Sequence, residues 1–168
     1  MGSRPAGCDL TGACVDWLQF GVQWLHVLLG IVWFGYAISI YFLIAPALAE
    51  LPEGQGRITN SRLGEIGRRV FPIVALLVLV LGILRGTVFG RITSFDALFT
   101  TYGIVWMIAL VFTLGLIFSG ARYMGPALER IKDAPDYRAA GERIRTISRI
   151  DLGLFGVVFT CMILMRFL

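Results

Sequence analysis

The sequence predicts an all-α integral membrane protein, a four-helix bundle with up-down-up-down order and both termini on the extracytoplasmic side. Of its 168 residues, 57% are hydrophobic and 15% are charged, against about 25% charged in an average soluble domain. The charges gather in blocks between apolar runs that are long enough to cross a bilayer. No basic stripe interleaved with aromatic residues occurs, so the expected partner is the lipid bilayer and not nucleic acid.

One membrane domain is expected over 1–168, because each apolar run is joined to the next by a short connection. The N-terminal segment 1–18 is predicted to lie at the interface, with a short helix at Asp9–Trp17. A charged cytoplasmic loop is expected at 121–149, and part of it, such as Ala139–Ile147, is expected to be helical and to project from the membrane. No long sequence repeat is visible. The four spanning helices are predicted at about 20–47, 70–89, 99–120 and 151–168.

The distribution of Lys and Arg predicts the orientation. Segment 50–69 holds four of these residues and segment 121–149 holds seven. The connection between the second and third spans holds one, Arg91, or two if Arg85 is counted. Because positive charge is retained in the cytoplasm, both rich segments are expected there, in a multi-pass protein of the inner membrane.

The first apolar run carries the only histidine of the chain, His26. An ionisable residue inside a membrane is costly and needs an explanation. At helical spacing His26 shares one face with Gly30 and Trp33, and a glycine below a histidine leaves a flat slot. In the second span, glycines repeat every fourth residue, a spacing that allows close approach by another helix or by a planar ligand. These glycines are Gly82, Gly86 and Gly90.

Depth estimates place polar and aromatic groups of all four helices at one level of the outer leaflet. With a rise of about 1.5 Å per residue, His26 lies roughly 9 Å below the start of its helix. Arg85, Arg166, Tyr102 and Trp106 fall near the same level. The candidate cofactor-binding residues are therefore His26, Arg85, Trp33, Gly30, Tyr102, Trp106 and Arg166.

This layer suggests that His26 is an axial ligand to b-type haem, with electron transfer or oxidation as the function. Imidazole is a common iron ligand, and Arg85 and Arg166 would pair with the two propionates. The alternative is a histidine hydrogen-bonded within the bundle, with both arginines extending to the headgroups. The chain would then be a non-catalytic structural or accessory subunit.

A second alternative is copper handling. Cys8 and Cys14 could join His26 in a copper site, because thiolates suit Cu(I). The same two cysteines could instead form a disulfide or remain idle thiols.

The stretch Trp24–Gly35, sequence WLHVLLGIVWFG, resembles the first-helix signature of a membrane superfamily. This superfamily includes copper-resistance D-like (CopD-like) domains, protoporphyrinogen oxidase of the HemJ type and the N-terminal membrane part of cytochrome-linked urate oxidase. Tyr102 and Gly103, at the start of the third span, also fit this group. The resemblance implies a small helical bundle in which His26 is the axial haem ligand.

Two departures from that family pattern narrow what the resemblance implies. The third span lacks the lysine of the oxidase and copper-resistance branches, and the only lysine is Lys132. A second histidine is also absent from the sequence. Haem would therefore be five-coordinate, bound by a further ligand other than histidine, or shared across a homodimer. The expected protein partners are a second copy of the chain, in a homodimer, or a larger membrane complex.

Overall fold

The computed structural model describes residues 17–168, and within them the chain is helical with no strand. Its α-helices are α1 (Trp17–Ser39), α2 (Ala45–Glu50), α3 (Glu53–Gly86), α4 (Thr101–Ser119), α5 (Gly125–Arg130) and α6 (Tyr137–Phe167). Two π-helical turns, Ile40–Ile44 and Gly120–Met124, join α1 to α2 and α4 to α5. Short 3₁₀ turns occupy Asp96–Phe99 and Ile131–Asp133.

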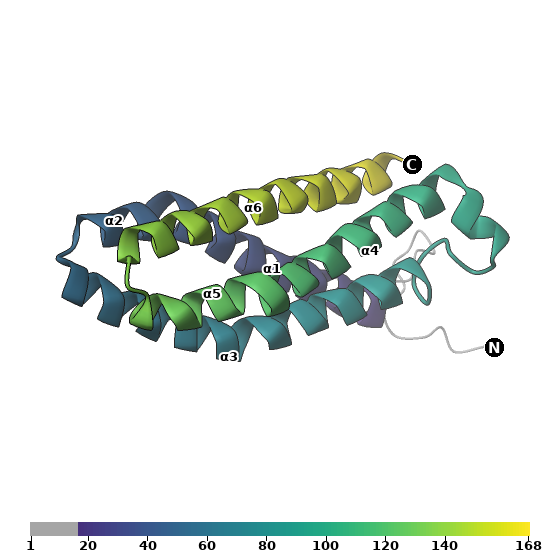
Figure 1. Ribbon diagram of the computed structural model, residues 1–168. Coiled ribbons are helices and arrows are strands. Elements are labelled where there is room, and N and C mark those ends of the chain that lie inside the picture. The colour runs from purple at the N-terminus through teal and green to yellow at the C-terminus, as the bar shows by residue number, and fades with distance from the viewer. Residues whose placement is uncertain (1–16) are drawn as a thin grey trace, which may run out of the picture.

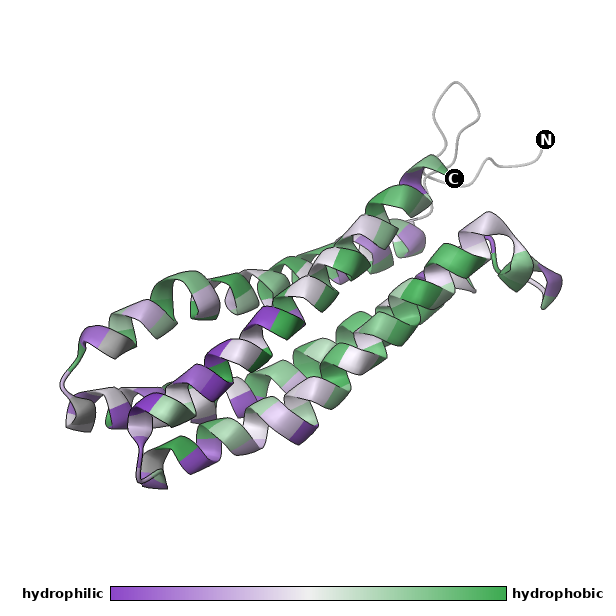
Figure 2. Cartoon of the chain, turned by 45° about the horizontal axis from the view of Figure 1, so that its top comes forward, coloured by the Kyte–Doolittle hydropathy of each residue, from purple (hydrophilic) through white to green (hydrophobic). Residues whose placement is uncertain are grey.

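Four helical stretches are long and apolar enough to span a membrane, which confirms the prediction of an all-helical fold with four such helices. They are Trp17–Leu48, Gly54–Gly86, Thr101–Arg130 and Tyr137–Phe167. At 30 to 33 residues each, they are about 45–50 Å long, whereas the hydrocarbon core is about 30 Å thick. The helices therefore extend well beyond the apolar layer. Figure 2 shows the hydrophilic residues of this excess concentrated where α2 meets α3 and α5 meets α6.

The long helices pack as antiparallel neighbours (Figure 1). The stretch α1–α2 runs antiparallel to α3, because residues later in the one contact residues earlier in the other. The contacts are Leu48 with Gly56, Tyr36 with Gly67 and His26 with Gly82. Most tertiary contacts lie within two hairpins, α1–α3 and α4–α6. The C-terminus lies at the same end of the bundle as the start of α1 (Figure 1).

The predicted starts of the second and fourth spans, at 70 and 151, were wrong. Helix α3 begins at Glu53 and α6 at Tyr137, so most of 50–69 and the second half of 121–149 are helical. The first half of 121–149 is also mostly helical, in α5 and the turns around it. The helix expected at Ala139–Ile147 is confirmed as part of α6. The rest was expected to form loops, but these segments are amphipathic and bury one face against neighbouring helices.

The inward faces of these charged segments explain why they remain helical. On α3, a side chain at Gly64 would press on Leu128, and one at Gly67 would meet the hydroxyl of Tyr36. On α6, Ile144 and Ser148 are buried, and the Asp136 side chain caps the helix by accepting a hydrogen bond from the Ala139 N–H at 3.0 Å.

The two hairpins repeat the same architecture, although their sequences show no long repeat. The π-helical turns start at Ile40 and Gly120, 80 residues apart. A similar tetrapeptide follows each turn, Ala45–Leu48 (APAL) and Gly125–Leu128 (GPAL). The buried positions Ala75 and Leu81 on α3 are likewise matched by the buried Phe155 and Cys161 on α6.

The expectations for 1–18, including the helix Asp9–Trp17, fall almost entirely on residues outside those that the structure describes. Trp17 and Leu18 are the exceptions, and they form the first residues of α1. Cys8 and Cys14, on which the copper and disulfide alternatives depend, also lie outside the described residues.

Candidate functional site

His26 is the one buried residue of α1, whose other residues are half-buried or exposed. All of α1 (Trp17–Ser39) is described, and His26 is its only buried residue, with 6% of its surface exposed. The imidazole points its Cε1 atom at α3, 3.1 Å from the position that a Cβ on Gly82 would take. Gly82 thus provides the space in which the ring rests. This is the position expected of an ionisable residue in a membrane helix, which faces the interior of the bundle.

The two ring nitrogens of His26 have different surroundings. The backbone of Val78 lies near enough to interact with the imidazole. Among the described residues, none supplies a hydrogen-bond partner for the buried Nδ1 atom. Within residues 17–168, the structure therefore leaves Nδ1 of His26 without a hydrogen-bond partner, although protein atoms cover it.

A second buried polar atom without a partner lies one helical turn away on the same helix. No group within residues 17–168 hydrogen-bonds to Oε1 of Gln23. Gln23 and His26 are three residues apart and share a face of α1. Buried polar atoms are nearly always satisfied, and two unsatisfied ones on adjacent turns identify this part of the bundle as a candidate ligand site.

Open space adjoins this face of α1 one turn further along the helix. A Cβ added to Gly30 would meet nothing within 4 Å. Beyond it, Trp33 packs edge-on against Phe155 of α6, with 5.0 Å between ring centroids. This face of α1 therefore has His26 against α3 at one end and Trp33 against Phe155 at the other, with no described protein atom over Gly30 between them.

Trp106 of α4 reaches the same stretch of α3. Its indole N–H donates to the Gly82 carbonyl at 3.5 Å, and a side chain on Gly86 would collide with the indole. The glycine repeat in α3 was expected to admit a neighbouring helix or a planar ligand. In the structure Gly82 and Gly86 receive the side chains of His26 and Trp106, whereas Gly90 lies against the backbone of residues 85 and 86.

The remaining predicted site residues divide into two groups. Arg85 is half-buried, and its charge acts on the His26 imidazole. Tyr102 instead lies beneath Arg91, whose guanidinium carbon is 5.6 Å from the ring centroid. Arg91 also donates a hydrogen bond to the carbonyl of Leu168, and Arg166 is exposed near that end of α6. The structure thus gathers His26, Trp106 and Arg85 around Gly82, and it groups Tyr102 with Arg91.

Sequence reasoning did not anticipate the roles of Val78 and Arg91. Val78 lies one turn from Gly82 on α3. Its backbone interacts with His26, and an interaction of the backbone cannot be inferred from the type of side chain. Arg91 could have been paired with Tyr102 because the short connection brings both residues to one end of the bundle. Across residues 17–168, no three His, Cys, Asp or Glu side chains gather in a metal-binding group.

Comparisons of the chain with protein-family models, with curated proteins and with solved structures find no match. The fold and the site define a class, namely a four-helix multi-pass membrane protein with a single buried histidine on its first span.

Proposed function

We propose that this protein binds b-type haem through His26 and takes part in electron transfer or oxidation at the outer side of the inner membrane. The observation that supports this most directly is the environment of His26: it is the one buried residue of α1, and its Nδ1 has no partner among the described residues. A histidine that served only in packing would be expected to satisfy both nitrogens.

The surrounding residues suit a haem. The imidazole of His26 would ligate the iron, and one turn further along the helix Gly30 has no protein atom of residues 17–168 over it. Arg85 is close enough to act electrostatically on the imidazole and would neutralise a propionate that would otherwise be stranded near lipid. Haem, when bound, supplies one-electron redox chemistry. The chain holds and orients it and limits its contact with water.

The arginine-rich end of the bundle faces the cytoplasm in this proposal, and both termini face outside. This orientation is supported by the contrast between the two ends. The helical extensions at α2–α3 and α5–α6 carry most of the Lys and Arg residues, whereas the connection 87–100 holds only Arg91. His26 then lies in the outer half of the bilayer, close to an extracytoplasmic redox partner.

Because the chain has one histidine, a second imidazole ligand could come only from another copy. The proposal therefore predicts five-coordinate haem, or haem with a further ligand other than histidine, when the protein is a monomer. Bis-histidine haem is expected only for a homodimer. The absorption spectrum reports the coordination state, and light scattering of the same sample reports the number of copies.

The test is the absorption spectrum of the purified protein in detergent. A Soret band is expected, and His26→Gly should abolish it, while added imidazole should restore it by entering the cavity. Ser148→Ala, which removes another buried polar group far from this site, is the matched control and should keep the band. A folded, colourless native protein, or one that contains copper in place of haem, would overturn the proposal.

A further inference from the structure

The π-helical turn between α1 and α2 has an identifiable cause. Pro46 has no N–H and its ring clashes with the carbonyl four residues earlier, so it cannot continue an α-helix undisturbed. The chain responds with a wider turn in which the Ala45 N–H bonds to the Ile40 carbonyl, five residues back. Pro126 produces the same turn in the second hairpin, where the Gly125 N–H bonds to the Gly120 carbonyl.

The two turns are placed identically with respect to the candidate site. His26 lies 14 residues before Ile40, and Trp106 lies 14 residues before Gly120. Their side chains meet the glycines of one helix, α3, at Gly82 and Gly86. In each hairpin, the side chain that contacts α3, His26 or Trp106, therefore lies the same number of residues before a proline-induced turn.

A π-helical turn accommodates one extra residue in an α-helix. If the turn became α-helical, the helix before it would rotate by about 100° and slide by about 1.5 Å relative to the helix after it. Helix α1 is continuous from Trp17 to Ser39, so it would rotate as one rod. His26 would then leave Gly82 and point away from α3.

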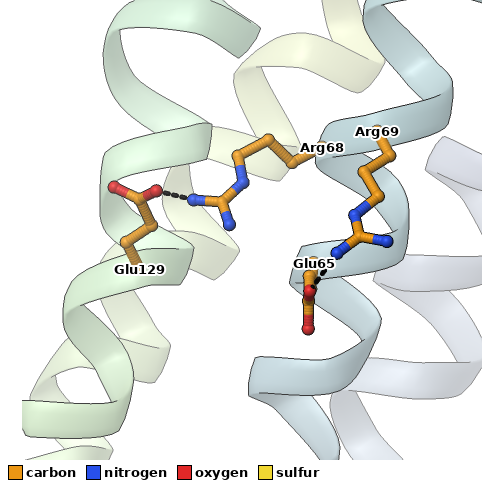
Figure 3. Close-up of polar contacts among 4 residues, drawn as sticks. All are labelled: Glu65, Arg68, Arg69 and Glu129. Atoms are coloured by element: carbon orange, nitrogen blue, oxygen red, sulfur yellow. Dashed lines mark hydrogen bonds and ion pairs between the residues drawn. The ribbon is translucent and has the colours of Figure 1, made fainter.

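Contacts from the opposite hairpin hold both turns in place. Arg149 of α6 donates from Nε to the hydroxyl of Tyr41 at 2.7 Å, within the first turn. After that turn, Leu48 of α2 is buried and its carbonyl lies against Gly56 of α3. Arg68 of α3 forms an ion pair with Glu129 of α5, directly after the second turn (Figure 3). The segment after each turn is therefore anchored, and a change in the turn would be expressed in the long helix before it.

We propose that Pro46 is a positioning residue for His26: its π-helical turn sets the rotation of α1 that places the imidazole against α3. The equivalent Pro126 turn sets the position of Trp106. The consequence for haem rests on the proposed function, but the rotation itself does not.

The experiment measures rotation without using haem. Cys8, Cys14 and Cys161 are changed to alanine, and His26→Cys is combined with Gly82→Cys, so that a short bis-maleimide can join α1 to α3. Pro46→Ala is expected to lower the crosslinking yield at least about fivefold, because the two thiols would no longer face each other. Pro126→Ala is the matched control and should leave the yield unchanged.

A register-restoring variant makes the test stringent. Deleting Phe42 together with Pro46→Ala removes the extra residue as well as the proline, so α1 should return to its original rotation and the crosslink should recover. Full crosslinking in Pro46→Ala, or failure of the deletion to restore it, would overturn the proposal. If Pro46→Ala alone does not fold, the deletion variant still tests the proposal, because the proposal requires His26→Cys and Gly82→Cys to crosslink in it.

The effect on haem binding is measured separately, from the Soret band of protein that retains His26. Pro46→Ala should lose most of the Soret band, and the deletion variant should regain it. If the native protein shows no Soret band but the crosslinking follows the expected pattern, the proposed function falls and the positioning role of Pro46 stands.

Discussion

The indole of Trp106 on α4 fills the place that a side chain on Gly86 of α3 would need. The same indole donates to the carbonyl of Gly82, one turn earlier. This contact joins the two hairpins in the apolar half of the bundle, where α1 and α6 meet separately through Trp33 and Phe155. The glycine at position 86 is thus required by a close side-chain contact.

Gly86→Ala should destabilise the protein by about 1–3 kcal/mol, because the added methyl group forces the indole or the helix to move. Thermal unfolding in detergent measures this effect. Gly115→Ala is the control, since nothing lies within 4 Å of a Cβ at that position. Trp106→Ala combined with Gly86→Ala should cost less than the sum of the two single changes. Equal stability of both glycine variants would contradict this packing.

Gly30→Leu should reduce haem content strongly while leaving the fold intact. The added side chain enters space that is free of protein atoms next to His26, so it would compete with the haem alone. Gly35→Leu is the matched control: Gly35 also has open surroundings, but it lies nine residues from His26 and so on the opposite face of α1. The ratio of Soret to protein absorbance measures the difference. Equal haem content in the two variants would place any haem elsewhere.

The four spans and the inward direction of His26 could be predicted because both depend on strong local signals, apolar length and a costly polar group in lipid. The starts of α3 and α6 could not, because apolar length marks only the part of a helix inside the bilayer. Their amphipathic extensions depend on what Gly64 and Ile144 face, which is tertiary information. The partners of Gly82 and Gly86 were equally hidden, since glycine spacing indicates close approach without identifying the group that approaches.

The Ser119 hydroxyl donates to the Asp151 carboxylate at 2.6 Å, in a half-buried contact between α4 and α6. Ser119→Ala should cost about 1–3 kcal/mol, because it leaves a partly buried carboxylate without its donor. In that background, Asp151→Leu should recover part of the loss, since the unpaired polar group is then removed as well. Unfolding in detergent gives both values. A neutral Ser119→Ala would show that water solvates the carboxylate equally well.

Two ion pairs lie near the charged end of the bundle (Figure 3). One joins the two hairpins and the other lies within a single helix. Arg68 pairs with Glu129 across the hairpins, whereas Arg69 pairs with Glu65 one turn away on α3 at 2.5 Å. Both pairs are half-exposed or more, so each should contribute only about 0.2–1 kcal/mol.

A double-mutant cycle on Arg68 and Glu129 should give a coupling energy within that range that falls as salt is raised. The cycle on Arg69 and Glu65 is the control for a pair inside one helix. A coupling above about 2 kcal/mol for Arg68 and Glu129 would show that the pair is more strongly shielded from solvent than its exposure indicates.

The proposed orientation of the bundle predicts which positions an impermeant thiol reagent can reach in intact cells. The native cysteines are first replaced by alanine, and one exposed residue at each end is then changed to cysteine, Ser94 in the connection 87–100 and Ala139 at the start of α6. Ser94→Cys should be labelled from outside, because that connection carries a single arginine and is inexpensive to translocate. Ala139→Cys should be labelled only after permeabilisation, since the segment around it carries several arginines that are retained in the cytoplasm. The reverse pattern would place His26 in the inner half of the bilayer, and the electron acceptor or donor of a haem at this site would then have to be cytoplasmic.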